Sequence, residues 1–264
     1  MSVVAVHDLA LRFGARTLFE GLDFELERGE LLAVLGPNGT GKTSLIRILL
    51  GLLQPSAGSV VVEGCPPHER RHLIGYIPQQ RVFERDVILR GRDLVRLGLD
   101  GHRWGFGRLH PEDRARIDAS LEEVGATAYA GAPIGRLSGG EQQRLRVAQA
   151  LVADPVLILA DEPLLSLDLA HQRAVVDLLD ARRERAGTPV VFVTHDVNPV
   201  LDSVDRVLYL APGAWAIGTP DEVLTSETLS GLYGTEVDVL RVRGRVVVVG
   251  TPDDQHVHHV ENGH

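Results

Sequence analysis

One short segment, GPNGTGKT at residues 36–43, combines glycines, a lysine and a threonine at a spacing suited to binding phosphate. Glycines let backbone N–H groups curl around phosphate oxygens. The lysine brings a positive charge to the β- and γ-phosphates, and the threonine hydroxyl is a Mg²⁺ ligand. The segment lies between an apolar run at 31–35 and helix-forming residues 44–53, which makes a simple glycine turn a poor explanation. We therefore predict a nucleoside triphosphate site formed by Gly36, Pro37, Asn38, Gly39, Thr40, Gly41, Lys42, Thr43 and Ser44.

A second segment, VLILADEP at 156–163, places two carboxylates directly after an apolar run. Asp161 is suited to the coordination shell of the same Mg²⁺, and Glu162 to orienting or deprotonating a water that attacks phosphate. An acidic turn at the end of a strand is common in itself. Together with the phosphate-binding segment upstream, however, the pair predicts hydrolysis of the nucleotide.

A third segment, LSGGEQQR at 137–144, begins a helix with a pair of glycines. Ser138 and Glu141 fit an N-terminal capping box, in which each side chain accepts a hydrogen bond from the other residue's backbone N–H. Such a cap does not require Gly139 and Gly140. Because glycine allows close approach and helix N-termini attract anions, the pattern predicts that this helix meets an anionic ligand.

The elements that would carry these segments alternate between strands and helices. Six short apolar runs predict strands of a mostly parallel α/β sheet; the runs are 3–6, 31–35, 59–64, 156–160, 189–194 and 205–210. Residues 86–153 contain no convincing strand, but they include an amphipathic helix with Ile117, Leu121 and Val124 on one face. Near the C-terminus we expect a helix start at 219–222 and a hairpin over 237–250.

Composition places the chain among ordinary globular proteins, with 44% hydrophobic and 24% charged residues in 264. The formal net charge of −9 argues against a general nucleic-acid binder, because such proteins usually carry a basic excess. The single cysteine, Cys65, excludes an internal disulfide framework and suits a reducing compartment. The sequence shows neither a signal peptide nor a long apolar run, so we expect a soluble intracellular protein.

The three segments together resemble the ATP-binding subunits of ABC transporters, and the resemblance extends over about residues 3–250. LSGGEQQR resembles the ABC signature motif, which is the most specific of the three. The resemblance implies ATP and Mg²⁺ as cofactors and a homodimer in which two chains pair head to tail. In that arrangement Ser138, Gly139 and Gly140 of one chain contact the γ-phosphate of ATP held by the other chain.

The resemblance also implies the fold, an α/β P-loop NTPase of the RecA-like type. Its sheet core has an antiparallel β edge and an inserted helical subdomain. We expect the ATPase core at 1–85 and 154–250, the helical signature subdomain at 86–153, and a disordered, histidine-rich tail at 251–264.

Two positions before the signature segment match family residues. Phe13, in LRFGAR, stands where the family usually has a tyrosine that stacks on adenine; a core aromatic near an edge strand is the alternative. Gln79, in GYIPQQ, resembles the Q-loop glutamine that senses Mg²⁺ and water and relays to the membrane subunit. Pro78 favours Gln79 over the adjacent Gln80 for this role.

Two positions after the signature segment match as well. Asp168, in LLSLD, stands in the D-loop and is expected to touch the opposite P-loop, although Leu167 departs from the usual alanine. His195, in VFVTHD, resembles the switch histidine that contacts the γ-phosphate. The residues expected to act in catalysis are then Lys42, Gln79, Glu162 and His195, and those expected at Mg²⁺ are Thr43, Gln79 and Asp161.

The resemblance implies partners as well: integral membrane permease subunits and, indirectly, a solute-binding protein. It places the chain in the cytoplasm, peripheral on the inner face of the cell membrane. DNA-repair and chromosome ATPases share the signature but insert a long coiled coil between the P-loop and the second carboxylate motif, and this chain shows no sustained heptads there. Ribosome-acting relatives usually carry two cassettes and a charged linker, whereas this chain has one cassette.

Three segments resemble the metal-importer group, which moves zinc or manganese from a binding protein: 101–114, 162–172 and 194–224. The tail adds four histidines that would suit Zn²⁺, although a solvated tail is the plainer interpretation; they are His256, His258, His259 and His264. We therefore predict import of a divalent metal ion. Import or export of a non-metal substrate, or an ATPase without a transport role, are the alternatives.

Overall fold

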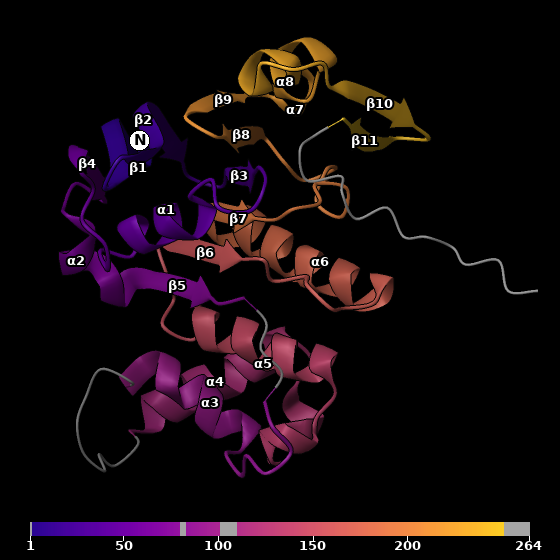
Figure 1. Ribbon diagram of the computed structural model, residues 1–264. Coiled ribbons are helices and arrows are strands. Elements are labelled where there is room, and N and C mark those ends of the chain that lie inside the picture. Colours follow the sequence, from indigo (N-terminus) through magenta and orange to yellow (C-terminus); the bar gives the residue numbers. More distant parts are fainter. Residues whose placement is uncertain (1, 80–82, 101–109, 251–264) are drawn as a thin grey trace, which may run out of the picture.

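The centre of the molecule is a six-stranded sheet, seen in the computed structural model of residues 2–79, 83–100 and 110–250 (Figure 1). Its strands, in spatial order, are β5 (Ile74–Ile77), β6 (Leu157–Asp161), β7 (Val190–Val193), β3 (Leu31–Leu35), β8 (Arg206–Ala211) and β9 (Ala214–Gly218). The first five are parallel and β9 pairs antiparallel with β8. The predicted α/β fold with a mostly parallel sheet is confirmed.

The strand β3 shows why the central strands are continuous apolar runs. Its alternate residues face two different cores, because side chains of a strand point to opposite faces. Leu32 and Val34 pack with helix α1 (Lys42–Leu49) and the N-terminal strands. Leu31 and Ala33 belong to the other core, which includes residues of the helices α5 (Gly139–Leu151) and α6 (Leu169–Ala186). Both faces are therefore buried, as a parallel sheet requires.

A smaller antiparallel sheet forms the predicted β edge. Its order is β2 (Arg16–Glu27), β1 (Ser2–Phe13) and β4 (Ala57–Val62). Phe19 and Leu22 of β2 are fully buried against the α1 side of the core. After β4 the chain forms the short helices α2 (Pro67–Arg70) and η1 (Arg71–Leu73), which lead into β5.

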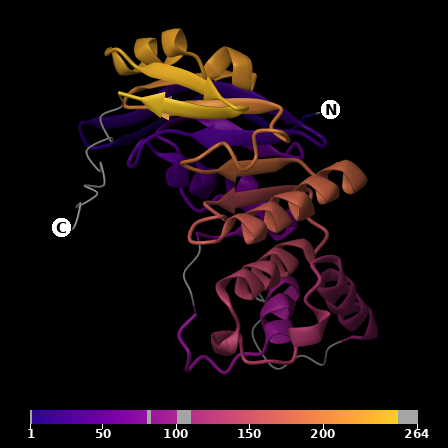
Figure 2. The same ribbon diagram turned by 90° about the vertical axis from the view of Figure 1, so that its right-hand side faces the viewer.

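Three helices between β5 and β6 pack together at one end of the molecule in both views (Figures 1 and 2). They are α3 (Gly91–Asp100), α4 (Pro111–Glu123) and α5, with η2 (Thr127–Tyr129) and η3 (Ile134–Arg136) between α4 and α5. The predicted apolar face of α4 is buried, since Ile117 and Leu121 are at most 2% exposed. The helices α3 and α5 approach closely because α3 carries a glycine: a Cβ on Gly98 would lie 2.1 Å from the carbonyl oxygen of Gln149.

The C-terminal segment forms the opposite end of the molecule (Figures 1 and 2). It contains α7 (Pro220–Val223), α8 (Ser226–Tyr233) and the hairpin of β10 (Asp238–Val242) and β11 (Arg245–Val249), whose turn is at Arg243 and Gly244. The helix start at Thr219, with its capping box to Glu222, and the hairpin are both as predicted. Asn198 ties the hairpin to the loop after β7: its Nδ2 donates to the carbonyl of Val246 at 2.9 Å, and its Oδ1 accepts from that residue's N–H at 2.8 Å.

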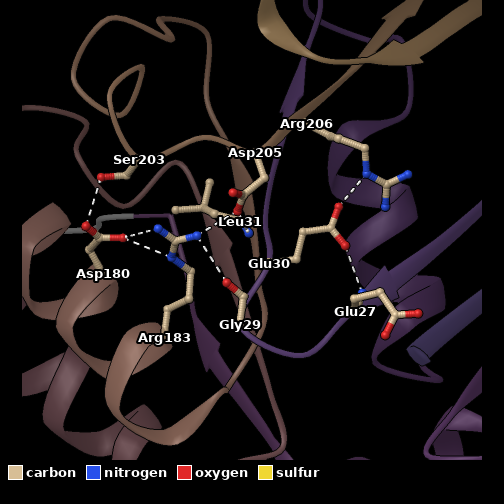
Figure 3. Close-up of polar contacts among 9 residues, drawn as sticks. All are labelled: Glu27, Gly29, Glu30, Leu31, Asp180, Arg183, Ser203, Asp205 and Arg206. Carbon is tan, nitrogen blue, oxygen red and sulfur yellow. Dashed lines mark hydrogen bonds and ion pairs between the residues drawn. The ribbon is translucent and has the colours of Figure 1, made fainter. Parts of the chain in front are cut away.

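A polar cluster around Arg183 fixes the N-terminal end of β3 to α6 and β8 (Figure 3). Its guanidinium donates to Asp180 at 2.9 Å, to Asp205 at 2.6 Å and to the carbonyl of Gly29 at 3.1 Å. Asp205 in turn accepts from the N–H of Leu31 at 2.8 Å. The Arg183 side chain is only 14% exposed, so these partners satisfy a largely buried cation. The start of β3 is thereby held, and its other end carries the phosphate-binding segment.

Two groups of predictions lie outside the described residues. The histidines of the tail at 251–264 are one, and most of the segment 101–114 is the other. Gln80 also lies outside them. Among the helices that the structure does describe, none has both the length and the apolar character needed to span a bilayer.

Candidate functional site

The phosphate-binding segment leaves the carboxyl end of β3 and coils into the first turn of α1. Gly36 has a φ of 134°, and a Cβ there would lie 2.0 Å from the carbonyl oxygen of Leu210 in β8. Gly41 has a φ of 106° and lies against the ring of Phe19. Both positions require glycine because of the fold itself, before any ligand is considered.

Lys42 lies inside the coil of this segment. Its side chain is buried, with the residue 6% exposed, and its Nζ donates to the carbonyl of Gly36 at 2.5 Å and of Pro37 at 2.9 Å. Thr40 also donates to Pro37, at 3.0 Å. Helix α1 begins at Lys42, with Gly41 as its N-cap, and its first turn contains no acidic side chain. The free N–H groups of this turn and the Lys42 ammonium therefore form a positively charged site for an anion.

Asp161 lies beside this helix start, at the carboxyl end of β6. Burial raises the pKa of its carboxyl group, while a hydrogen bond with the Thr43 side chain acts in the opposite direction. A hydroxyl and a carboxylate that touch each other form an oxygen donor set of the type that Mg²⁺ prefers. These two residues therefore fit the predicted metal, and a bound cation would favour the ionised form of Asp161.

Three more predicted residues meet at the same edge of the sheet. Gln79 follows β5, Glu162 follows β6 and His195 follows β7, and these strands are neighbours. The Nε2 of Gln79 lies 3.4 Å from Oε2 of Glu162, and Nδ1 of His195 lies 3.8 Å from the same oxygen. Carboxyl ends of adjacent parallel strands are where α/β proteins bind ligands. The structure thus gathers Gln79, Glu162 and His195 into one cluster.

The backbone at Glu162 has an unusual conformation. Its φ is 46°, in the left-handed region that non-glycine residues rarely adopt. Such conformations concentrate at functional sites, where the surrounding structure holds a side chain in a required direction. The Glu162 side chain is 16% exposed, so the carboxylate is largely withdrawn from water yet lies against Gln79 and His195.

Phe13 ends β1 at the turn into β2, and its side chain faces solvent. The residue is 53% exposed, which excludes the alternative of a core aromatic. Its cross-strand neighbour Arg16 donates to the carbonyl of Gly39 at 2.8 Å, so this turn touches the phosphate-binding segment. Sequence reasoning missed Arg16, whose only local signal is its place beside Phe13 in LRFGAR.

The signature segment has the predicted capping box at the start of α5. The Ser138 hydroxyl accepts from the N–H of Glu141 at 3.3 Å, and the Glu141 carboxylate accepts from the N–H of Ser138 at 2.8 Å. The nearest atoms to the Cβ position of Gly140 belong to His171, in the first turn of α6. In this chain the signature glycine therefore packs against α6, whereas the glycines at 36 and 41 pack against β8 and β2.

Asp168 is the N-cap of α6, accepting from the N–H of His171 at 2.9 Å. This backbone hydrogen bond, followed by one from the His171 side chain, lowers the pKa of the Asp168 carboxyl. The carboxylate is exposed and stays ionised at neutral pH. Sequence reasoning identified Asp168 but missed His171, although the spacing of three residues from a cap aspartate is a usable signal.

A cleft of about 400 Å³ opens beside the site, lined in part by Thr43, Gln79 and Asp161. Its far wall is α5, where the guanidinium carbon of Arg146 lies 4.6 Å from the ring centre of Phe83. Gln142 of α5 accepts from the N–H of Phe83 at 3.0 Å. The segment that follows Gln79 is thus bonded to the same helix that begins with Gly139 and Gly140.

Comparison with known proteins agrees with this arrangement. The model of the ABC transporter family matches residues 19–165, more than half of the chain. A probable metal transport system ATP-binding protein of Chlamydia pneumoniae is 34% identical, over 89% of this chain and 91% of that protein. The zinc transport system ATP-binding protein TroB of Treponema pallidum is 35% identical, over 89% and 88%. The iron(3+)-hydroxamate import ATP-binding protein FhuC of Bacillus subtilis is 32% identical, over 91% of each.

Two solved structures are similar in fold and sequence. A metal-chelate type ABC transporter in an inward-facing conformation matches with a TM-score of 0.79 and 30% identity, over 94% of this chain and 96% of that one. A dimeric ATP-binding cassette in a post-hydrolysis state, bound to ADP and phosphate, matches with a TM-score of 0.68 and 26% identity, over 81% and 97%.

Proposed function

Because the chain belongs to the ABC transporter family, we propose that it is the ATP-hydrolysing subunit of a transporter that imports a divalent metal ion, zinc or manganese. The observation that supports ATP hydrolysis is that the predicted phosphate-binding, metal-binding and catalytic side chains lie together at one edge of the sheet. The buried Lys42, the bonded pair Thr43 and Asp161, and the cluster around Glu162 all lie at the carboxyl ends of adjacent strands.

The chemistry follows from the positions of these side chains. Lys42 and the N–H groups of α1 stabilise the negative charge of the β- and γ-phosphates. Glu162 accepts a proton from water as the water oxygen bonds to the γ-phosphorus and the bond to the β–γ bridging oxygen breaks. Gln79 and His195 flank that carboxylate and orient the water and the γ-phosphate. Thr43 and Asp161 would hold Mg²⁺, which when bound neutralises phosphate charge.

The working unit in this proposal is a head-to-tail homodimer. Ser138, Gly139 and Gly140 of one chain would contact the γ-phosphate of ATP on the partner's P-loop, and Asp168 would approach the same P-loop. The exposed Asp168 and the dimeric cassette of similar fold support this arrangement. Hydrolysis would release the clamp, because ATP is the ligand that biases the closed state.

The membrane partners would be integral permease subunits on the inner face of the cell membrane, supplied by a solute-binding protein. The segment after Gln79 supports this part of the proposal. It includes Ile88, which is 85% exposed, and it joins α5 through Phe83 and Gln142. In this proposal residues 86–153 form a subdomain that moves as a unit. Binding of a permease near Ile88 would then shift helix α5, which begins with the signature segment.

Phe13 provides a prediction about nucleotide binding. Replacing it with alanine should raise the Kd for ATP about tenfold, because stacking of a base on an aromatic ring contributes roughly 1–3 kcal/mol. Replacing it with tyrosine keeps the ring and should leave the Kd nearly unchanged. Titration with a fluorescent ATP analogue measures both. Equal affinity for wild type and the alanine variant would remove Phe13 from the site.

The choice of metal is tested in cells rather than on the isolated chain. Total zinc, manganese and iron are measured by mass spectrometry in a metal-poor medium, in cells lacking this protein, with it restored, and with the Lys42→Ala form. We expect zinc or manganese alone to fall and only the wild-type chain to restore it. If no metal changes, the importer proposal is wrong.

Import of an iron chelate is the second candidate. The similarity to the iron(3+)-hydroxamate protein and to the metal-chelate transporter favours it. In the same experiment it predicts that cellular iron falls while zinc and manganese stay constant, most strongly when iron is supplied as a hydroxamate chelate.

A further inference from the structure

The imidazole of His171 contacts two segments that lie far apart in the sequence. Its Nδ1 is 2.8 Å from both carboxylate oxygens of Asp168. On its other side, Cδ2 and Nε2 lie 2.0 and 2.5 Å from where a Cβ on Gly140 would be. The ring therefore fills the space between the D-loop carboxylate and the backbone of the signature glycine.

This contact explains, from packing within one chain, why glycine occupies position 140 of the signature segment. A Cβ at position 140 would overlap with the His171 ring where it now lies, so the ring, whose side chain is 41% exposed, would have to leave this position. Glycine at this position thus lets α5 come into contact with the first turn of α6.

The ring is held from both sides. The same carboxylate oxygen that its Nδ1 approaches also accepts the N–H of His171 at 2.9 Å, so Asp168 holds both the backbone and the side chain of one residue. Opposite lies the backbone of Gly140 in the capped first turn of α5. A displacement of either segment would therefore press on the imidazole and be transmitted to the other.

We propose that His171 is a positioning residue that locks Asp168 and the signature segment 138–140 into one relative geometry, so that both reach the partner's ATP together. The inference rests on the proposed function, which assigns both segments to the nucleotide of the opposite chain. It predicts a defect in closing the dimer and in turnover, while the chain's own P-loop continues to bind ATP.

The test compares His171→Ala with His171→Asn, which keeps a donor near the position of Nδ1, and with His72→Ala, the same change at an exposed histidine on η1. Nucleotide affinity is measured by titration with a fluorescent ATP analogue. Dimerisation with ATP is measured by sedimentation in the Glu162→Gln background, and steady-state ATPase in the wild-type background. For His171→Ala we expect an unchanged nucleotide Kd, and kcat and dimer affinity each about tenfold lower, the effect of losing one charge-assisted hydrogen bond. His171→Asn should recover part of both.

Three outcomes separate the possibilities. If His171→Ala dimerises and hydrolyses ATP like His72→Ala, the positioning role is wrong. If it loses nucleotide affinity in parallel with kcat, His171 is a structural residue and the inference also fails. If the wild-type chain itself binds no ATP, or if Lys42→Ala hydrolyses ATP normally, the proposed function fails, and that result is separate from the behaviour of His171.

A stability cycle tests the same contact without nucleotide. Alanine in place of glycine normally stabilises a helix, because glycine loses more conformational freedom on folding. Gly140→Ala should nevertheless lower the thermal midpoint of the wild-type chain, because the new Cβ meets the imidazole. In the His171→Ala background the same change should raise the midpoint. A rise in both backgrounds would show that the ring moves aside at little cost and does not hold the two segments together.

Discussion

Glu162→Gln is expected to lower the kcat for ATP hydrolysis about 1,000-fold, within the range that a general base contributes. Glutamine has nearly the same shape but cannot accept a proton from the attacking water. The neighbours Gln79 and His195 keep their positions, and the buried Lys42 is untouched, so ATP still binds. Bound ATP that is not hydrolysed should hold the head-to-tail dimer closed. We expect the variant to elute as a dimer with ATP on size exclusion and as a monomer without it.

The matched control for this experiment is Glu184→Gln, the same substitution at an exposed position of α6. It should hydrolyse ATP at the wild-type rate and show no ATP-dependent shift in elution. Wild-type turnover by Glu162→Gln would show that this carboxylate is not the base. If Glu162→Gln hydrolyses ATP slowly but does not form a dimer with ATP, Glu162 remains the proposed base, and the proposed closed, ATP-bound dimer is wrong.

The strands with the clearest signal in the sequence are those that the fold buries on both faces. The central strands β3, β6 and β7 are uninterrupted apolar runs, because each of their faces meets a core. The strands β5 and β9 were not predicted. β5 has four residues and lies at the edge of the sheet, and every residue of β9 is only half-buried, so neither has a strong apolar signal.

The strand β2 was missed for a different reason. Its apolar and polar residues alternate over most of its length, but Gly21 has a φ of 62° and its pairing with β1 contains several register shifts. Glycine within a strand usually marks such an irregularity. The alternation is therefore interrupted where a sequence pattern would need it to continue.

Some residues of the site can be identified from the residues next to them in the sequence, whereas others are identified only by their contacts in the folded chain. The phosphate-binding segment and Glu162 come directly after a strand and Asp161 ends one, so all three stand out in the sequence, and their motifs predict their chemistry. Arg16 and His171 act on Gly39 and Gly140, which lie in other elements of the chain. Which element packs beside them is a property of the whole fold, so the sequence does not show these two contacts, although the spacing of His171 from Asp168 does indicate a helix cap.

Lys42→Ala is expected to raise the Kd for ATP about 100-fold, the effect of losing a charge-assisted interaction with phosphate that contributes roughly 1.5–3 kcal/mol, and to reduce hydrolysis to background. Lys42→Arg should not restore binding. The lysine is 6% exposed and its Nζ fits between the carbonyls of Gly36 and Pro37, where a planar guanidinium cannot take the same place.

The composition of the chain allows a direct measurement of this site, because Lys42 is the only lysine among the 264 residues. An amine-acylating reagent can therefore modify only Lys42 and the N-terminal amine, and intact-mass spectrometry separates one addition from two. If the ammonium binds the β- and γ-phosphates, ATP should protect against the second addition with the same concentration dependence as its Kd, while AMP, which lacks those phosphates, should not. Equal protection by ATP and AMP would mean that Lys42 is shielded by general closure of the site, and that the charge contact with the terminal phosphates is wrong.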